Sequence, residues 1–365
     1  DEIARAAALL GRAERPVILA GGGAAYSGAG AELRRLAERL SAPVVVEVTS
    51  RGVVPEDHPL VLGPAGIVGY PPAGAALRSA DLLLAIGTRI SDLPTARGTL
   101  LPENLAIVHV NLDPREIGRL HPAALGVVAD ARAFVAALNA HLDGVGLTVP
   151  SQRTAWAAEL KRNAGTWRED WLASAPDNGR VQPHEIVRTL LDALPPDAFI
   201  AHGAGDHQFY GQMVPVRQLH GHLLSGTLGA MGEGVAYALG AKLVHSDRPV
   251  VACVGDGDLM LQLGDLETMV RERLAVTVVV FNNFRLGSQR PRMEAYGRVA
   301  GVDHGNPDFA KLAELFGCDG YRVDRPGQLR AVFERAIASD RPVLIDVIVD
   351  PDAQPPRIQI SRQAR

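Results

Sequence analysis

The chain has 365 residues, of which 47% are hydrophobic and 21% are charged, and its formal net charge at pH 7 is −4. This length suits two globular domains, and a slightly acidic chain without a cluster of Lys and Arg lacks the positive field that nucleic-acid binding needs. No apolar run approaches the roughly 20 residues that span a bilayer, so we also expect no role in a membrane.

Strand and helix patterns alternate along the first part of the chain. Short apolar runs predict strands, and apolar residues at helical spacing predict the helices between them. We expect strands at residues 16–20, 43–46, 81–86 and 106–112, and helices at residues 1–11, 31–40 and 131–141. Such alternation indicates right-handed crossover connections and a parallel sheet with helices on both faces.

The alternation resumes after a linker. Residues 144–150 are rich in Gly and Pro, and a charged helical pattern covers residues 151–171. We then expect strands at residues 198–201, 249–254, 275–281, 321–323 and 342–349, and helices at residues 183–194, 229–244, 261–270, 309–316 and 326–339. The sequence therefore predicts an α/β protein with two doubly wound parallel-sheet domains, at residues 1–145 and 183–350, an arm at 146–182 and a polar tail at 351–365.

Two strand ends in the second domain carry a motif that suits a metal ion. Gly255-Asp256-Gly257 follows one apolar run, and Asn282-Asn283 follows the next after 24 intervening residues. Because parallel strands end at the same sheet edge, a carboxylate and a carboxamide oxygen should converge there, and Mg²⁺ favours such a set of few protein oxygens. The glycines let the backbone approach an anion, and the first amides of the helix at 261–270 can face phosphate. Alone, Gly-Asp-Gly is most often a turn and Asn-Asn a loop, but at this spacing they predict a magnesium–diphosphate clamp.

The motif resembles the thiamine diphosphate (ThDP) signature, and neighbouring segments strengthen the resemblance. Residues 225–242 (SGTLGAMGEGVAYALGAK) look like the glycine-rich segment that holds the thiamine ring in acetolactate synthase-like enzymes. Residues 203–210 (GAGDHQFY) resemble their Gly-x-His-Gln diphosphate segment, and residues 282–287 (NNFRLG) and 306–309 (NPDF) continue the pattern. The resemblance covers essentially the whole chain and implies ThDP and Mg²⁺ as cofactors.

The resemblance also implies roles for individual residues. The magnesium ligands would be the side chains of Asp256 and Asn283 and the backbone carbonyl of Arg285. Met231 would support the cofactor and bring its pyrimidine amine toward the thiazolium carbon, although the residue could instead fill the core. Asp258 could be a third metal ligand, but we favour a cap on the following helix. The wider cofactor site would comprise Gly205, His207, Gly229, Met231, Gly255, Gly257, Asp258, Leu259, Asn283, Leu286 and Gly287.

One domain of the family has no counterpart in the sequence. ThDP enzymes of this family start with a domain that binds the aminopyrimidine and carries the activating glutamate. This chain opens with what resembles the helix leading into the central domain, and none of its Glu residues matches that glutamate. We therefore expect no catalytic side chain here, and a pyrimidine domain that comes from a separate subunit or from a trimmed segment. Alone, the chain should bind diphosphate weakly and turn over almost no substrate.

Two departures from the family pattern concern the substrate. After residues 87–89 (GTR), acetolactate synthases usually continue Phe-Asp-Asp-Arg, whereas this chain has ISDL at residues 90–93 and so lacks the arginine that helps hold a carboxylate. The bulky Trp found after the Asn-Asn loop is replaced around residues 289–292 (QRPR). Arg290 or Arg292 could meet an anionic acceptor there, or simply lie at the surface. We therefore expect an acceptor other than that of strict acetolactate synthesis.

The first domain resembles the one that holds FAD in acetolactate synthases and nucleotides in related lyases. Residues at its strand ends could line an adenine nucleotide such as FAD or ADP, namely Gly21, Gly22, Gly23, Arg89 and Asp113. Such binding would be structural rather than redox, and glycine turns after strands also occur for packing alone. A nicotinamide dehydrogenase ranks lower, because Tyr26 stands where the last glycine of Gly-x-Gly-x-x-Gly belongs.

The leading hypothesis is the larger portion of a ThDP- and Mg²⁺-dependent carboligase, which decarboxylates a 2-oxo acid and transfers the acyl anion to a carbonyl acceptor. The alternatives are a nonoxidative 2-oxo acid decarboxylase and a non-catalytic cofactor-binding subunit; the intact Asp256 and Asn283 weigh against the latter. The family places ThDP between protomers, so we expect a homo- or hetero-oligomer. Only Cys253 and Cys318 are present, and Cys253 lies within a strand pattern, so we expect no disulfide framework and a cytoplasmic location.

Overall fold

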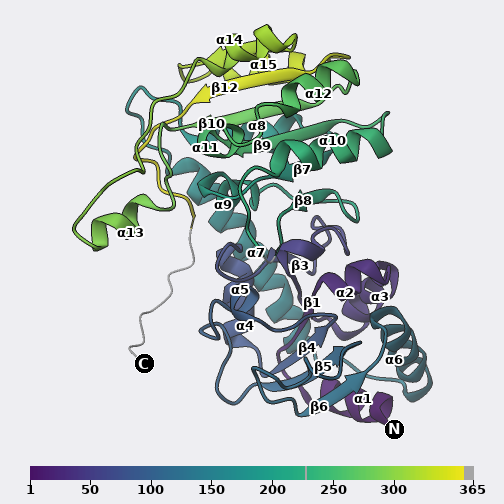
Figure 1. Cartoon of the computed structure of the whole chain (residues 1–365). Coiled ribbons are helices and arrows are strands. Elements are labelled where there is room, and N and C mark those ends of the chain that lie inside the picture. The colour runs from purple at the N-terminus through teal and green to yellow at the C-terminus, as the bar shows by residue number, and fades with distance from the viewer. Residues whose placement is uncertain (227, 357–365) are drawn as a thin grey trace. The chain divides into compact units, whose positions relative to one another are not determined.

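The computed structural model describes residues 1–226 and 228–356, which form two compact units (Figure 1). Unit 1 comprises Asp1–Asp170 and Pro215–His220, and unit 2 comprises Trp171–Val214 and Gly221–Pro356. Residue 227, within the glycine-rich segment, and residues 357–365 of the predicted tail lie outside the described residues. Each unit has its own all-parallel sheet with helices around it, so the predicted fold class is confirmed.

A six-stranded parallel sheet forms the centre of unit 1, in the order β3-β2-β1-β4-β5-β6. Its strands are β1 (Pro16–Ala20), β2 (Val44–Val46), β3 (Val61–Pro64), β4 (Leu82–Ile86), β5 (Ala106–Asn111) and β6 (Leu125–Val128). Its helices are α1 (Glu2–Arg12), α2 (Gly22–Tyr26), α3 (Gly30–Leu40), α4 (Pro71–Ser79), α5 (Asp92–Thr95), α6 (Ala131–Val145), most of α7 (Ser151–Ala173) and the 3₁₀ helix η1 (Val48–Ser50). The strand order reverses between β1 and β4, which makes their carboxyl ends the switch point of this sheet.

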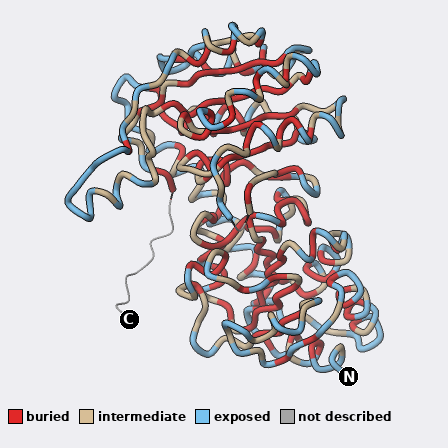
Figure 2. Tube along the Cα trace, in the orientation of Figure 1, coloured by how far each residue is buried: buried red, intermediate tan, exposed pale blue. Residues whose placement is uncertain are grey.

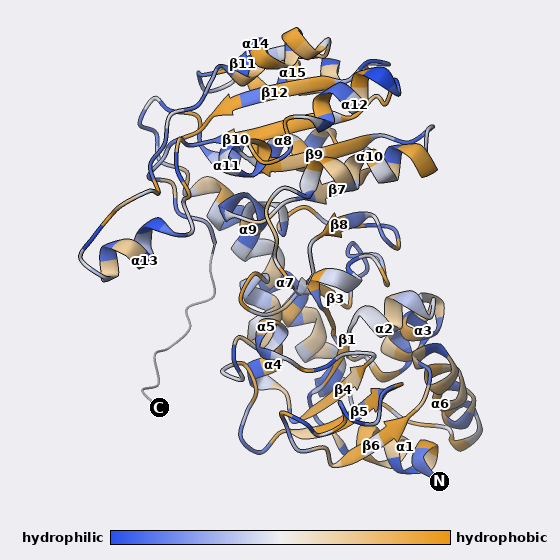
Figure 3. Ribbon diagram, viewed as in Figure 1, coloured by the Kyte–Doolittle hydropathy of each residue, from blue (hydrophilic) through white to orange (hydrophobic). Residues whose placement is uncertain are grey.

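The strands of unit 1 are apolar runs because helices cover both faces of a parallel sheet. Every residue of β1 and β4 is buried, as Figure 2 shows in red, and the same strands are hydrophobic in Figure 3. Helix α6 contacts both α1 and α3, and the three helices bury leucines from their inner faces against the sheet. The periodicity read from the sequence therefore corresponds to the side that each helix buries.

Helix α6 is longer than its pattern predicted. The Asp130 side chain caps its start by accepting from the Ala133 amide at 2.9 Å, and Gly146 ends it in the left-handed conformation with φ 64°. The linker predicted at residues 144–150 is therefore shortened to residues 146–150. Helix α7 follows directly and runs for 23 residues.

A buried arginine on α7 donates hydrogen bonds to backbone carbonyls at the ends of two helices of unit 1. Arg153 is 1% exposed and donates to the carbonyl oxygens of Leu10 at 3.2 Å and Leu40 at 3.4 Å, and also to that of Ala13. These carbonyls lie at the ends of α1 and α3, where no further turn of helix is present to satisfy them. The start of the predicted arm is therefore part of the core of unit 1.

A second six-stranded parallel sheet forms the centre of unit 2, in the order β11-β12-β10-β9-β7-β8. Its strands are β7 (Phe199–His202), β8 (His222–Leu224), β9 (Val250–Gly255), β10 (Thr277–Asn282), β11 (Asp319–Val323) and β12 (Val343–Ile348). Its helices are α8 (Pro183–Ala193), α9 (Asp206–Gly211), α10 (Gly234–Val244), α11 (Asp256–Leu259), α12 (Asp265–Arg271), α13 (Arg290–Ala295), α14 (Phe309–Phe316) and α15 (Leu329–Ile337). Helices α10, α12 and α14 share one apolar core, and α8 contacts α9 and α15.

Two helices of unit 2 differ from their predictions. The helix expected at residues 229–244 begins at Gly234, because Gly229 and Gly232 adopt left-handed backbone conformations, with φ 58° and 79°. The helix expected at residues 261–270 is replaced by α11 and α12. Between them, turn hydrogen bonds such as Gln262 N–H to Leu259 O, at 2.9 Å, take the place of a helical ladder. The amides expected to face phosphate therefore belong to α11, which starts at the strand end itself.

Two further sequence expectations concern membranes and cysteines. No helix in the described ranges has the length and apolar character needed to cross a bilayer. Cys253 and Cys318 are both free and buried. Burial raises the pKa of the Cys253 thiol to about 12 and that of Cys318 to about 11, so both remain protonated at neutral pH. The prediction that Cys253 is a core residue is confirmed.

Candidate functional site

A pocket of about 620 Å³, counting space open to solvent, lies at the carboxyl ends of β7, β9 and β10 in unit 2. The strand order of this sheet reverses between β7 and β9, and ligands of open α/β sheets bind at such switch points. Many of the predicted site residues line it: Gly205, His207, Met231, Gly255, Asp256, Gly257, Asp258, Asn283, Arg285, Leu286 and Gly287. Gly229 and Leu259 are not among the lining residues, and Leu259 is fully buried in the core of unit 2.

Asp256 follows β9 directly and is only 2% exposed. Its Oδ1 accepts from the Gly257 amide at 2.9 Å, and its Oδ2 accepts from Asn306 Nδ2 at 2.7 Å. Burial raises the pKa of this carboxyl group, whereas the hydrogen bonds from Asn306 and Gly257 lower it. The Phe284 amide is a third hydrogen-bond donor to this carboxylate. A carboxylate has about four acceptor sites, so one remains to coordinate a cation in the pocket.

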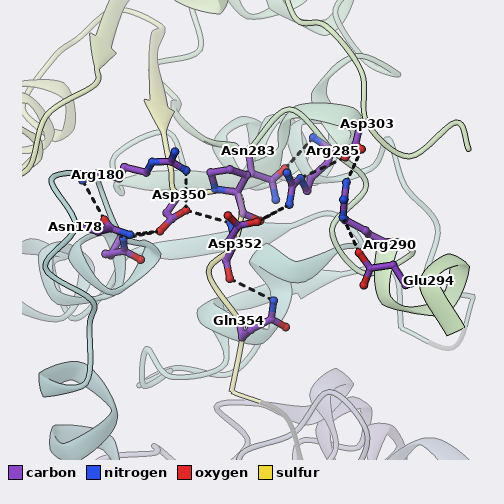
Figure 4. Close-up of polar contacts among 12 residues, drawn as sticks. Asn178, Arg180, Asn283, Arg285, Arg290, Glu294, Asp303, Asp350, Asp352 and Gln354 are labelled. Atoms are coloured by element: carbon purple, nitrogen blue, oxygen red, sulfur yellow. Dashed lines mark hydrogen bonds and ion pairs between the residues drawn. The ribbon is translucent and has the colours of Figure 1, made fainter. Parts of the chain in front are cut away.

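The loop after β10 brings Asn283 and Arg285 to the same pocket. Asn283 Oδ1 accepts from the Arg285 amide at 3.2 Å, and Phe284 between them has φ 58°, a rare conformation for a bulky residue. The Arg285 side chain donates to Pro351 O at 2.9 Å and to Asp352 Oδ1 at 3.0 Å (Figure 4). Because both its backbone and its side chain are held, the turn that carries the Arg285 carbonyl is well defined.

The oxygen donors at this loop suit a hard cation. In residues 1–226 and 228–356, no group of three or more His, Cys, Asp or Glu side chains is arranged to hold a metal. The predicted ligand set needs no such group, since it consists of one carboxylate, one carboxamide and one backbone carbonyl. Mg²⁺ binds in this way when a phosphate supplies further oxygens, whereas zinc would want nitrogen or sulfur.

Asp258 does not cap the following helix, so that prediction is wrong. Its Oδ1 accepts from the Gly232 amide at 2.6 Å, while α12 has Gly264 at its N-cap and no side-chain cap. Asp258 thus holds the loop before α10 against the start of α11. Burial raises the pKa of Asp258 to about 6, although the hydrogen bond from Gly232 lowers it.

His207 lies beside this carboxylate, with Nε2 at 4.0 Å from Asp258 Oδ2. The imidazole is 3% exposed, and burial lowers its pKa to about 4. At neutral pH it is therefore uncharged, with one ring nitrogen as a donor and the other as an acceptor. Its one N–H also has an acceptor in the Gly203 backbone, so a hydrogen bond to an anion would replace that contact, and the neutral ring adds no positive charge to the pocket.

Met231 and two glycines shape the apolar side of the pocket. Met231 is 37% exposed and lines the pocket, so it does not fill the core. A Cβ on Gly257 would lie 2.7 Å from Leu286 Cδ2 and 3.6 Å from Met231 Cε, and a Cβ on Gly255 would lie 3.0 Å from His207 Nδ1. A side chain at either position would make Leu286 or His207 shift.

The opposite wall of the pocket is built around Asp350, which directly follows the end of the predicted last strand. Its carboxylate accepts from Asn178 Nδ2 at 2.7 Å, Gln182 Nε2 at 3.0 Å and Arg180 Nη1 at 3.2 Å (Figure 4). Although burial alone would raise it, these hydrogen bonds bring the pKa of Asp350 down to about 2. The cluster joins the segment before α8 to the chain that leaves β12.

The arginines proposed as anchors for an acidic acceptor are occupied or exposed. Arg290 donates to Glu294 Oε1 at 3.0 Å and pairs with Asp303, as Figure 4 shows. Within the part of the chain that the structure describes, the Arg292 side chain reaches only Gln289 Oε1, at 3.5 Å. An anion would therefore have to displace two carboxylates to bind Arg290.

The predicted nucleotide residues of unit 1 have a packing explanation. A Cβ on Gly21 would lie 2.7 Å from Thr88 Cα, so the turn after β1 needs glycine to pass close to the end of β4. Burial raises the pKa of Glu47, whose carboxylate accepts from Thr88 Oγ1 at 2.5 Å and from the Gly22 amide. Asp113 is paired with Arg115 at 2.7 Å, and Arg89 lies 3.8 Å from Glu116. Because the Glu47 carboxylate already accepts from the Gly22 amide, a phosphate bound at that amide is disfavoured.

Several polar residues at the site were not among the predicted site residues. Asp206 and Asp350 line the pocket, and Asn306 reaches Asp256. Asp206 lies within the segment at 203–210 and Asp350 follows a predicted strand, so the strand-end rule could have identified both. Asn306 opens the segment at 306–309 that belongs to the family pattern, but its contact with Asp256, 50 residues away, is not indicated by any periodicity in the sequence.

Comparison with known proteins agrees with this geometry. Residues 3–138 match the family model for the "Thiamine pyrophosphate enzyme, central domain", and residues 203–347 match that for the "Thiamine pyrophosphate enzyme, C-terminal TPP binding domain". The second match contains the ends of β9 and β10 and the segment that follows β7.

Curated relatives extend the similarity over nearly the whole chain. It is 33% identical to a probable acetolactate synthase large subunit of Methanocaldococcus jannaschii, over 96% of this chain and 60% of the relative. It is 34% identical to an acetolactate synthase of Mycobacterium bovis (97% and 58%), and 33% identical to an acetolactate synthase large subunit of Corynebacterium glutamicum (97% and 57%). The chain thus spans about three fifths of the length of these relatives. It belongs to the thiamine pyrophosphate enzyme family, as an acetolactate synthase-like member with the central domain and the C-terminal TPP-binding domain.

Proposed function

We propose that the chain is the larger portion of a ThDP- and Mg²⁺-dependent carboligase, which decarboxylates a 2-oxo acid and transfers the acyl anion to a carbonyl acceptor. The observation that carries the proposal is the pocket in which Asp256 and Asn283 follow adjacent strands of unit 2. The similarity to acetolactate synthases supports the reaction class. The different residues at positions 90–93 favour an acceptor other than a second 2-oxo acid.

In this proposal the pocket residues bind and orient the cofactor. Asp256, Asn283 and the carbonyl of Arg285 hold Mg²⁺, and the neutral His207 donates a hydrogen bond to a diphosphate oxygen. Bound ThDP supplies a nucleophilic carbon and takes up the electrons that remain when carbon dioxide leaves the substrate. Met231 supports the rings from the apolar side, and the glycines keep the diphosphate close to the backbone.

The proposal includes parts that lie outside the chain. A pyrimidine domain, from another subunit or another segment, would supply the activating glutamate, and the active assembly would be a homo- or hetero-oligomer in the cytoplasm. FAD or ADP in unit 1 stays a secondary proposal, with Arg89 and Asp113 as its polar contacts.

Binding of ThDP and Mg²⁺ tests the first step. Isothermal titration calorimetry should detect binding of ThDP that depends on Mg²⁺, and Asp256→Ala should weaken it about 100-fold or more, since even indirect metal contacts are worth 10–100-fold. Glu267→Ala on α12 is the matched control, because that carboxylate is exposed and pairs with the nearby Arg271. Equal binding by the Asp256→Ala variant would rule out the metal site.

Product analysis separates the candidate reactions. The chain is combined with a pyrimidine domain of the family and supplied with a 2-oxo acid, with and without an aldehyde or keto-acid acceptor. A coupled product that requires the acceptor supports the carboligase, whereas an aldehyde as the sole product supports the decarboxylase. Cofactor binding without turnover in any combination would favour the non-catalytic subunit.

A further inference from the structure

A series of buried polar groups connects the sheet of unit 2 with the pocket. Asp346 on β12 and Asn282 at the end of β10 are both fully buried. Asn282 Nδ2 donates to Asp346 Oδ1 at 2.8 Å, and Asn282 Oδ1 accepts from Asn306 Nδ2 at 2.7 Å. The same Nδ2 of Asn306 donates to Asp256 Oδ2 at 2.7 Å. Since β12, β10 and β9 are neighbours in the sheet, the series runs across three strands and ends at the pocket.

Asp346, at the end of the series away from the pocket, sets the direction of every hydrogen bond in it. An ionised carboxylate only accepts hydrogen bonds, so Asn282 turns its NH₂ toward Asp346 and its oxygen toward Asn306. Burial raises the pKa of Asp346, whereas the hydrogen bond from Asn282 and Arg322 Nη1, at 3.3 Å from Asp346 Oδ2, favour the ionised form. Asn306 must then present its NH₂, and its two hydrogens go to Asn282 and Asp256. Its oxygen faces His304 Nδ1 at 3.0 Å.

We propose that Asn306 is a positioning residue for the cation site, and that Asp346 orients Asn306 through Asn282. The inference rests on the proposed function, because it gives Asn306 a role only if Asp256 binds a divalent cation. The Gly257 amide holds one oxygen of Asp256 and Asn306 holds the other, so the carboxylate cannot rotate away from the pocket. Loss of a hydrogen bond that orients a metal-binding carboxylate typically lowers metal affinity 10–100-fold.

Titration with Mn²⁺ in the presence of ThDP tests this role. Free Mn²⁺ is followed by electron paramagnetic resonance, which measures the Kd directly and needs no catalytic activity. Asn306→Ala should raise the Kd about tenfold or more. The matched control is Asn139→Ala in unit 1, where another buried amide donates to Glu32 O at 3.0 Å. This control should change the thermal unfolding temperature but leave the Kd for Mn²⁺ as it is in the wild-type protein.

A second variant acts at a distance from the pocket. In Asp346→Asn the buried group can donate as well as accept, so Asn282 and Asn306 lose their preferred orientation while Asp256 is untouched. We expect its Kd for Mn²⁺ to rise about three- to tenfold, less than in Asn306→Ala. Unchanged Kd values in both variants, with the wild-type protein binding Mn²⁺, would overturn the inference alone. Because the chain alone should bind diphosphate weakly, the wild-type protein is also titrated with a pyrimidine domain of the family present. Absence of ThDP-dependent Mn²⁺ binding in that combination would overturn the proposed function and this inference with it.

Discussion

Replacing Asp350 with Asn should destabilise unit 2 in a way that depends on pH. The carboxylate accepts hydrogen bonds from Asn178, Gln182 and Arg180, and its side chain is 5% exposed. An amide of the same shape removes the charge and turns one acceptor into a donor, so the hydrogen bonds from the neighbouring side chains cannot all persist. The change therefore removes a charge-assisted cluster while leaving the packing nearly intact.

The size of the effect follows from the pKa of Asp350. Burial opposes ionisation, but the hydrogen bonds outweigh it and lower the pKa from 3.8 to about 2. At 1.36 kcal/mol per unit of pKa, this contributes roughly 2 kcal/mol to stability at pH 7. A depressed pKa gives stability that is complete well above pH 3.8 and is lost as the pH falls toward 2. About half of it, ~1 kcal/mol, should remain at pH 3.

Urea unfolding followed by circular dichroism, at pH 7 and at pH 3, measures both values. Asp113→Asn is the control, because hydrogen bonds from Arg115 also lower the pKa of Asp113 to about 2. That pair is exposed to solvent, so its replacement should have little effect on stability. The reasoning is refuted if Asp350→Asn costs the same at both pH values, or if Asp113→Asn costs as much as Asp350→Asn.

Three further predictions concern contacts within each unit. Arg153→Ala should lower the unfolding free energy of unit 1 by about 3 kcal/mol, because buried carbonyls at the ends of α1 and α3 lose their donor; an unchanged urea midpoint would contradict this. Gly240→Ala should stabilise unit 2 by about 0.5–1 kcal/mol and so raise its melting temperature, because the added methyl group meets no atom within 4 Å. Gly234→Ala on the same helix should lower the melting temperature, because its Cβ would lie 2.7 Å from a main-chain nitrogen. Arg285→Ala should speed hydrogen exchange at residues 284–289 with a global loss below about 1 kcal/mol; unchanged exchange would show that its ion pairs do not hold the loop.

Local pattern predicted nine of the twelve strands in the described residues and missed the short strands β3, β6 and β8. The strands at residues 16–20 and the helix at residues 309–316 have the predicted bounds, because buried parallel strands are continuous apolar runs and helices have one apolar face. Predictions failed where backbone geometry depends on distant contacts. Gly229 and Gly232 delay the start of α10, and Asp258 reaches back to the Gly232 amide instead of capping a helix.

The same distinction applies to the candidate site. Asp256 and Asn283 could be predicted to meet because each follows an apolar run, and adjacent parallel strands end at one edge of a sheet. The contacts that hold Asp256 and the loop after Asn283 could not be predicted. Asn306, which binds Asp256, and Asp352, which binds Arg285, come from loops that follow other elements. A hydrogen bond between distant residues leaves no period in the sequence, because it depends on how the strands are ordered and where the loops between them turn. The kinds of ligand atom at the pocket therefore follow from local sequence, and their orientation follows from the tertiary fold.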